Sequence, residues 1–377
     1  MLVSDIQIID LEDSCELRAQ VKFDTHWVWG DEPFDLWYRF PLLCRECLSA
    51  DHGDPFVAAF LPMAMVLGES LEIVAGISPQ LADTLPQIQE IYRCWNPTLS
   101  EVVCRAPLHQ PIMAVHNAGA GLFVSMGADS SYTLLKNVMG EGRGPTISHL
   151  INVLGFDIYL WESSRYPAVL SAMTKLAHEL DKQVIPVATN LRDVSDRIVD
   201  WVRMYHGAAL ASVSLALGRM LSHVYIASGQ TYGLLIGSGS HPLLDPLWST
   251  ESTYVLHDGL ERTRLQKFQY LARSPRMIRH LRVCAADDTT GSYNCGVCRK
   301  CIYATIALHV AGVLGQCETL PQKIDVDLLR TLDVGNALAV RGFRELVDAL
   351  GGNKEDSGIR SALQDRLDEC TTQSIHA

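Results

Sequence analysis

The chain has 377 residues, 48% hydrophobic and 20% charged, so it is long enough for one large globular domain and a second, smaller unit. Its formal net charge of −12 argues against nucleic acid or anionic lipid as a partner and favours a small-molecule or peptide substrate. No apolar run reaches the ~18 residues of a membrane helix, and the acidic first residues do not resemble a signal peptide, so we expect no membrane association and a cytoplasmic location.

Residues 1–110 predict a small α+β domain. Alternating apolar and polar residues are typical of half-buried strands and occur at 6–9, 16–23 and 36–40. A helix at 55–65, a short strand at 71–75 and a second helix at 79–92 complete this part. We expect the domain to contact a protein partner or to capture substrate.

Residues 111–315 predict a doubly wound parallel sheet. Strands are expected at 121–124, 147–154, 184–188 and 224–227, and they alternate with helices expected from Ser131, at 166–180 and at 194–220. Such alternation implies right-handed β-α-β crossovers, and ligands of these sheets bind beyond the carboxyl ends of the strands. The tail at 316–377 predicts helices at 326–332 and 337–350 and a polar end that is a candidate for disorder.

The first strand of this region leads into Ser125-Met126-Gly127-Ala128-Asp129-Ser130 and then into a helix. Backbone N–H groups at such a turn, together with the positive end of the helix, form an anion site, to which Ser125, Ser130 and Ser131 add hydroxyl groups. Asp129 repels phosphate and therefore predicts a Mg²⁺ ion between the two, or a helix cap. Ser and Asp also cap helices that bind nothing, so the six residues alone leave both interpretations open.

Four cysteines, Cys284, Cys295, Cys298 and Cys301, lie within eighteen residues. Four thiolates complete a tetrahedral Zn²⁺ site with no open position, so this zinc would fold the segment rather than perform chemistry. An iron–sulfur cluster is the alternative, because cysteines at two-residue spacing also occur in ferredoxin-like segments.

The segment at 125–130 resembles the S-G-G-x-D-S signature of the PP-loop ATP pyrophosphatases; Ser125, Gly127, Asp129 and Ser130 match, and Met126 replaces a glycine. A four-cysteine segment about 150 residues further along the chain strengthens the resemblance to 7-cyano-7-deazaguanine synthase and its paralogues. This resemblance covers residues 118–315. It implies a fold of the PP-loop, or adenine nucleotide alpha hydrolase, type with a zinc knuckle at 284–301, and ATP, Mg²⁺ and Zn²⁺ as cofactors.

Further candidate residues follow the strands or lie between the two motifs. Asp157 and Asn190 follow the second and third strands. They should therefore face the same crevice as the segment at 125–130, which we call the phosphate loop. Gly239 permits close approach of a ligand, and His241 or Asp245 are candidate bases. Four positively charged residues are candidates to neutralise the triphosphate of ATP: Arg264, Lys267, Arg282 and Lys300.

The chemistry implied by the resemblance is attack of a carbonyl or carboxylate oxygen on the α-phosphate of ATP, with release of pyrophosphate. A nucleophile then displaces AMP to form an amide, nitrile or other ligation product. We assign Asp129, Lys267, Arg264 and His241 to catalysis. The alternatives are ATP-dependent sulfur transfer to a base or small molecule, which requires a catalytic cysteine, and a nucleotide-binding regulatory or scaffold protein in which Met126 has altered turnover.

Overall fold

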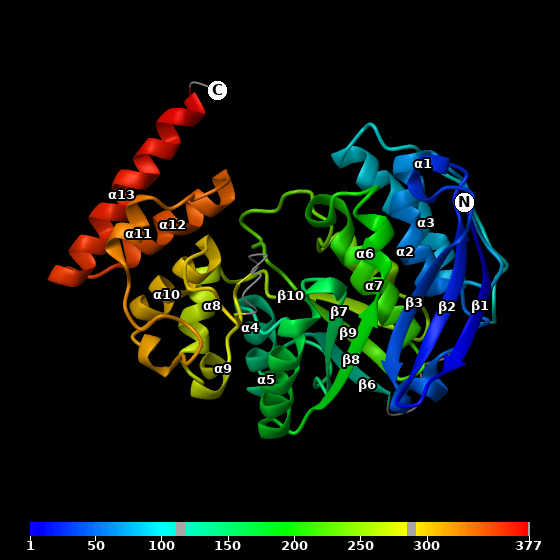
Figure 1. The fold of residues 1–377 in the computed structure, drawn as a ribbon, viewed down its shortest axis with the longest axis horizontal. Coiled ribbons are helices and arrows are strands. Elements are labelled where there is room, and N and C mark those ends of the chain that lie inside the picture. The colour runs from blue at the N-terminus through cyan, green and yellow to red at the C-terminus, as the bar shows by residue number, and fades with distance from the viewer. Residues whose placement is uncertain (111–117, 285–291, 376–377) are drawn as a thin grey trace.

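The computed structural model describes residues 1–110, 118–284 and 292–375 and shows an α/β fold built on one large sheet (Figure 1). The ten strands of the described residues lie side by side in the order β10-β9-β6-β7-β8-β3-β2-β1-β4-β5. Their bounds in chain order are β1 Leu2–Asp10, β2 Ser14–Lys22, β3 Phe34–Pro41, β4 Leu71–Ile73, β5 Cys104–Arg105, β6 Gly119–Phe123, β7 His149–Leu154, β8 Gln183–Thr189, β9 Leu221–Ala227 and β10 Tyr254–Asp258.

The half of the sheet from β10 to β8 is parallel throughout. The chain runs from β6 through β7 to β8 in one direction and then returns to place β9 and β10 on the other side of β6. The strand order therefore reverses between β6 and β9, and the carboxyl ends of these two strands flank the crevice where open α/β sheets bind their ligands. The prediction of a parallel α/β sheet is confirmed.

The front part of the chain joins the same sheet. Strands β1, β2 and β3 form an antiparallel meander, and β3 pairs antiparallel with β8, opposing Tyr38 to Thr189 and Arg39 to Ala188. The Tyr38 hydroxyl donates to Ser212 Oγ over 2.9 Å, which ties this meander to α7. The predicted domain boundary near residue 110 adjoins 111–117, which lie outside the described residues, and the strands on its two sides are continuous in one sheet.

Helices cover both faces of the sheet. Alternate residues of each parallel strand enter two apolar cores: Phe123 and Ile226 face the core with α2 and α7, whereas Leu122 and Tyr225 face the core with α4 and α5. The second core continues into the C-terminal helices at one end of the molecule (Figure 1). The bounds are α1 His26–Trp29, α2 Asp54–Leu67, α3 Pro79–Trp95, α4 Ala128–Val138, α5 Tyr166–Glu179, α6 Leu191–Ser195, α7 His206–Ala216, α8 Arg264–Leu271, α9 Pro275–Arg279, α10 Arg299–Val310, α11 Val326–Arg330, α12 Ala337–Ala349 and α13 Lys354–Ile375.

Two sequence predictions about helices are wrong. The single helix expected at 194–220 is divided into α6, a π-helical turn at Trp201–Tyr205 and α7. The division occurs because Asp200 caps a new helix start, its side chain accepting hydrogen bonds from the backbone N–H groups of Val202 and Arg203.

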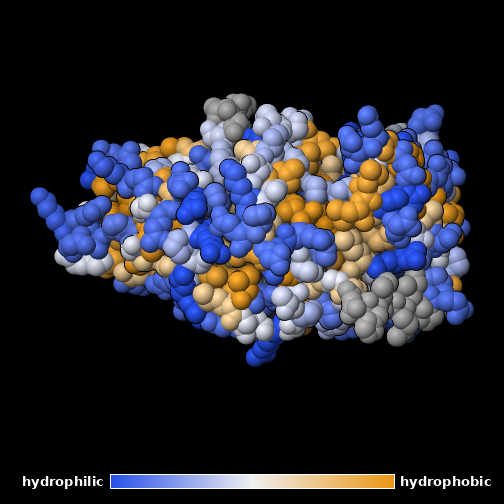
Figure 2. Space-filling view, turned by 90° about the horizontal axis from the view of Figure 1, so that it is seen from below, coloured by the Kyte–Doolittle hydropathy of each residue, from blue (hydrophilic) through white to orange (hydrophobic). Residues whose placement is uncertain are grey.

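The polar C-terminal end is a helix, α13, rather than a disordered segment. It buries Ile359, Leu363 and Leu367, which are spaced four residues apart and so lie on one face of the helix. The remaining surface of this end of the molecule is largely hydrophilic (Figure 2). Within the described residues, every helix is too short or too polar to cross a membrane.

Candidate functional site

The phosphate loop connects β6 to α4. Gly127 is the N-cap residue of α4 and no side chain caps the helix, so the first N–H groups of α4 have no partner within the helix. Ser125 Oγ accepts from the N–H of Gly127 over 3.4 Å, and Asn152 Nδ2 donates to the Val124 carbonyl over 2.6 Å. The second bond fixes the end of β6 against β7. This geometry supplies a helix N-terminus that is open to an anion.

Met126 takes the left-handed conformation, with φ 64°. A residue other than glycine costs on the order of 1 kcal/mol in this region. Its side chain, however, is 1% exposed and packs in the core beneath the sheet. The Met126 carbonyl accepts a 3.0 Å hydrogen bond from the Arg282 N–H. The Met126 side chain therefore lies in the core and lines neither of the two cavities described below.

Asp129, in the first turn of α4, forms ion pairs with two cations of α8. Arg264 donates to Asp129 Oδ2 over 2.9 Å and Lys267 donates to Oδ1 over 2.8 Å. Burial by itself raises the pKa of Asp129, but the two cations outweigh it and lower that pKa from 3.8 to about 2. Lys267 is 1% exposed and also donates to the Ser228 carbonyl. The structure therefore brings together Asp129, Arg264 and Lys267, which are three of the four residues assigned to catalysis from the sequence.

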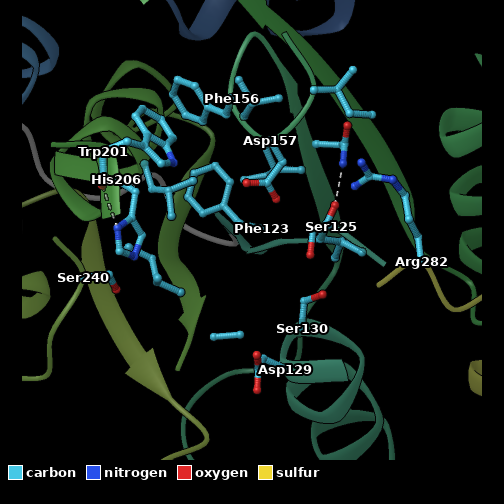
Figure 3. Close-up of a pocket in the computed structure, with 18 residues that line it drawn as sticks. Phe123, Ser125, Asp129, Ser130, Phe156, Asp157, Trp201, His206, Ser240 and Arg282 are labelled. Carbon is cyan, nitrogen blue, oxygen red and sulfur yellow. Dashed lines mark hydrogen bonds between the residues drawn. The ribbon is translucent and has the colours of Figure 1, made fainter. Parts of the chain in front are cut away.

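A small cavity of about 210 Å³ opens beyond the carboxyl ends of β6, β7 and β9 (Figure 3). Its walls are mainly aromatic and aliphatic, and polar groups from the phosphate loop lie on one side. A volume of this size suits one planar heterocycle. The lining residues are Phe123, Val124, Ser125, Asp129, Ser130, Ile151, Asn152, Val153, Phe156, Asp157, Ile158, Trp201, His206, Leu210, Ile226, Ala227, Ser240 and Arg282.

A large cavity of about 510 Å³ adjoins it. The two cavities share Ser125, Asp129, Asp157 and Arg282, so they meet at the phosphate loop. The other walls of the large cavity come from the loop after β9, from α8, from the beginning of α10 and from α12. Three of its lining residues are carboxylates. Five carry positive charge: Arg264, Arg282, Arg299, Lys300 and Arg341.

Arg282 lies at the junction of the two cavities and is 6% exposed. Its guanidinium group makes no hydrogen bond or ion pair with any residue that the structure describes. A buried charge without a partner is costly, and an anion at this position would remove that cost. Desolvation lowers the pKa of Arg282, and Asp157 opposes this shift. The N-terminus of α4 and Arg282 therefore lie together at the crevice, where an anion would meet N–H donors and a positive charge.

The π-helical turn brings two further residues into the small cavity. Trp201 begins the turn and His206 follows it, and both line the cavity. His206 Nδ1 lies 3.1 Å from the Trp201 carbonyl oxygen (Figure 3), so with a proton on Nδ1 the other ring nitrogen is a free acceptor. Burial lowers the pKa of His206, which favours its neutral form. The sequence analysis missed both residues because π-turns have no local signature that distinguishes them from α-helix.

Six residues predicted for the site lie outside the linings of both cavities: Ser131, Asn190, Gly239, His241, Asp245 and Lys267. Asn190 instead accepts from the Trp37 N–H and donates to the Asp35 carbonyl, which joins α6 to β3. Gly239 allows close packing on α7, since a Cβ there would lie 2.5 Å from the Tyr205 backbone nitrogen.

His241 is buried, and its ring packs edge-on against Trp95 at 4.8 Å. Its neighbour Ser240 does line the small cavity. The Ser240 hydroxyl donates to Asp245 Oδ2 over 2.6 Å, and the same oxygen lies 2.7 Å from His257 Nδ1. Asp245 is fully buried within this network. The segment around His241 therefore supports the cavity wall from behind.

The four cysteines predicted as metal ligands come together. Their sulfur atoms all lie within 4.8 Å of one another, with Cys284 and Cys298 at 3.8 Å and Cys295 and Cys301 at 3.9 Å. Four sulfurs around zinc at ~2.3 Å in a tetrahedron lie about 3.8 Å apart, so the donor set fits such an ion. Residues 285–291 of this segment lie outside the described residues. The group can hold a metal such as zinc, and it lies at the start of α10, beside the large cavity.

No family model, no curated protein and no solved structure matches this chain.

Proposed function

We propose that the chain is an ATP-using enzyme that adenylates a carboxylate or carbonyl oxygen and releases pyrophosphate, similar to 7-cyano-7-deazaguanine synthase and other PP-loop enzymes. The observation that carries the proposal is the convergence of the open N-terminus of α4 and the buried, unpaired Arg282 at the switch point of a parallel sheet.

The shape of the two cavities supports a particular placement of ATP. The aromatic small cavity suits the planar base, whereas the phosphates would lie at the N–H groups of α4 and at Arg282. Asp129 and Asp157 line both cavities and offer the carboxylate oxygens that Mg²⁺ prefers. The large cavity is then left for the acid to be activated, whose carboxylate would meet the α-phosphate at the shared residues.

Positive charges around the loop would stabilise the transfer. Arg264 and Lys267 hold Asp129 beside the loop and supply charge as negative charge moves onto the pyrophosphate. Zinc at the four cysteines would supply only structure, because four thiolates leave no open coordination position.

Sulfur transfer is less well supported. A thiolation enzyme needs a cysteine at the reacting centre, and among the described residues Cys284, a knuckle residue, is the one cysteine lining either cavity. Cys104 lies on β5, at the opposite edge of the sheet. The position of Met126 also removes one reason to suppose that turnover has been lost, since its side chain leaves the loop open.

The proposal is tested by incubating the purified protein with ATP and MgCl₂ and measuring AMP and pyrophosphate. The acids supplied would be 7-deazaguanine-7-carboxylate and a mixture of peptide acids, with ammonium ion or amines as nucleophiles. We expect equal amounts of AMP and pyrophosphate, and a loss of at least about a hundredfold in Asp129→Ala and Arg282→Ala. ATP binding without AMP from any acid would favour the regulatory alternative, and unchanged turnover in Asp129→Ala would contradict the assignment.

A further inference from the structure

Exposed apolar side chains line the large cavity or follow its lining residues closely in the chain. Val202 and Leu338 line the cavity and are 65% and 40% exposed. Tyr232, Leu235 and Ile236 extend from the same short loop that supplies Leu234 to the cavity wall, and they are 40–67% exposed. We call these five residues the apolar rim. Clusters of exposed apolar side chains mark surfaces that bind another molecule more often than they occur by chance.

The rim loop is held in a defined shape. The Gln230 side chain donates to the Ile236 carbonyl over 3.0 Å and accepts from the Ile236 N–H over 2.8 Å, which closes the loop at residues 230–236. Gly239 N–H donates to the Val202 carbonyl over 3.0 Å and so fixes the far end of the loop beside the π-helical turn. The loop therefore presents Tyr232, Leu235 and Ile236 outward on an ordered support.

The opposite wall of the entrance belongs to α12. Thr263 Oγ1 donates to Glu345, the rings of Phe343 and Tyr303 meet edge-on at 5.4 Å, and Arg299 donates to the Val334 carbonyl over 3.4 Å just before this helix. These contacts hold α12 against α8 and α10.

Behind the rim, the large cavity carries charges without partners. Lys300 and Arg341 line it, and neither makes a hydrogen bond or ion pair with any residue that the structure describes. A third cation without a partner among the described residues, Arg282, is buried where the two cavities meet. The chain as a whole carries a net charge of −12, so most of its surface does not attract an acidic ligand. The local excess of cations favours binding of such a ligand at the large cavity.

We propose that the large cavity binds the carboxyl terminus of a peptide or protein, with apolar residues preceding the terminal carboxylate. The apolar rim takes the side chains of the last residues, Lys300 and Arg341 hold acidic or carbonyl groups along the chain, and the terminal carboxylate reaches Arg282 and the phosphate loop. A chain end fits this arrangement because apolar groups lie at the entrance and the reacting centre lies at the inner end.

This inference rests on the proposed adenylation and names its substrate class. In the step, one oxygen of the terminal carboxylate attacks the α-phosphorus of ATP and forms a new P–O bond, while the bond from that phosphorus to the bridging oxygen of the β-phosphate breaks. Pyrophosphate takes the electron pair of the broken bond as Mg²⁺ and the cations of the loop compensate its charge. No proton, oxidant or reductant is needed, because the attacking acid is already ionised at neutral pH.

The test uses the full-length protein with two libraries of randomised hexapeptides, one ending in free carboxylates and one ending in amides. Each library is incubated with the protein, ATP, MgCl₂ and ammonium ion, which displaces AMP from the acyl adenylate, and AMP is measured together with the peptides that bind. ATP affinity is measured in the same samples. We expect AMP and enrichment of apolar C-terminal residues with the free acids, and neither with the amides.

Variants of the apolar rim and of the cavity cations separate the contributions of these two groups to peptide binding. Ile236→Asp should weaken peptide binding at least about tenfold and erase the apolar preference, and Arg341→Ala should also weaken peptide binding, without changing ATP affinity more than about threefold. Val74→Asp, which alters an exposed apolar residue of the front part, and Arg330→Ala, on α11, serve as matched controls. Both controls should bind peptides as the unaltered protein does.

Two results would overturn the inference. Equal use of both libraries, or unchanged peptide binding in both rim and cation variants, would show that the large cavity does not select chain ends. AMP formed with 7-deazaguanine-7-carboxylate and not with the peptide acids would refute the peptide substrate while leaving the adenylation intact, and absence of ATP binding would refute the adenylation itself.

Discussion

At the scale of single residues, Met126 combines backbone strain with deep burial. The left-handed φ of 64° would favour glycine, but the side chain fills space in the core between α4 and the C-terminal helices. The sequence shows that Met126 replaces a glycine of the signature that the segment resembles. It could not foresee the direction of the side chain, because that direction depends on helices that are far away in the sequence.

Met126→Gly separates the two effects. The glycine removes strain of about 1 kcal/mol, but deletion of a buried methionine side chain costs roughly 2–5 kcal/mol. We therefore expect a lower free energy of unfolding in urea and no gain in ATP affinity. ATP binding that became tenfold tighter would show that the methionine obstructs the phosphate site after all.

The ion pairs of Asp129 predict how the free energy of unfolding depends on pH. Because its pKa in the folded chain is lowered to about 2, the stability it contributes is fully present above about pH 4 and is lost as the pH falls through 2. Asp129→Asn should lower the free energy of unfolding at pH 7 by about 2 kcal/mol. The difference between variant and unaltered protein should shrink as the pH is lowered from 4 towards 2.

The measurement is a series of urea unfolding curves across this pH range. Asp83→Asn is a suitable control, because Asp83 is exposed and makes no ion pair with the described residues. A difference of the same size at pH 2.5 and pH 7 would show that the ion pairs with Arg264 and Lys267 are not its cause.

At the scale of elements, the strands of the parallel half were predictable from their apolar runs, since β6, β7, β8 and β9 each begin within three residues of the expected position. β10 was missed because its sequence ends in His257 and Asp258, which resemble loop residues. His257 is buried there beside Asp245, and Asp258 accepts from Lys136, so each polar side chain has a partner that only the fold supplies.

The cysteine group connects α10 to the rest of the site. Cys298 and Cys301 lie at the beginning of α10, and Arg299 between them reaches the segment before α12. Removal of the metal should therefore loosen the C-terminal helices as well as the knuckle.

Zinc analysis and thermal unfolding check this expectation. We expect one zinc ion per chain, and we expect Cys298→Ser or treatment with a strong chelator to lower the melting temperature by at least ~5 °C. Cys94→Ser, at an exposed cysteine of α3, should change neither value. Iron in place of zinc in anaerobically purified protein would identify the group as an iron–sulfur site.

At the scale of the whole molecule, the site depends on contacts between distant parts of the chain. Phosphate-loop residues and the four cysteines were found in the sequence because their spacing is local. Arg341 and Trp201 were not, because α12 and the π-helical turn reach the cavities only through tertiary packing. The pairing of β3 with β8 was likewise not predictable from the sequence, and it makes the front part an extension of the parallel sheet.

The placement of ATP is the central claim, and a crystal structure with Mg²⁺ and α,β-methylene ATP tests it most directly. We predict the base in the small cavity, against Phe156 and Trp201, and the phosphates on the N–H groups at the start of α4 with Arg282 bound to them. A nucleotide bound elsewhere, or an Arg282 that remains unpaired when nucleotide is present, would contradict the account.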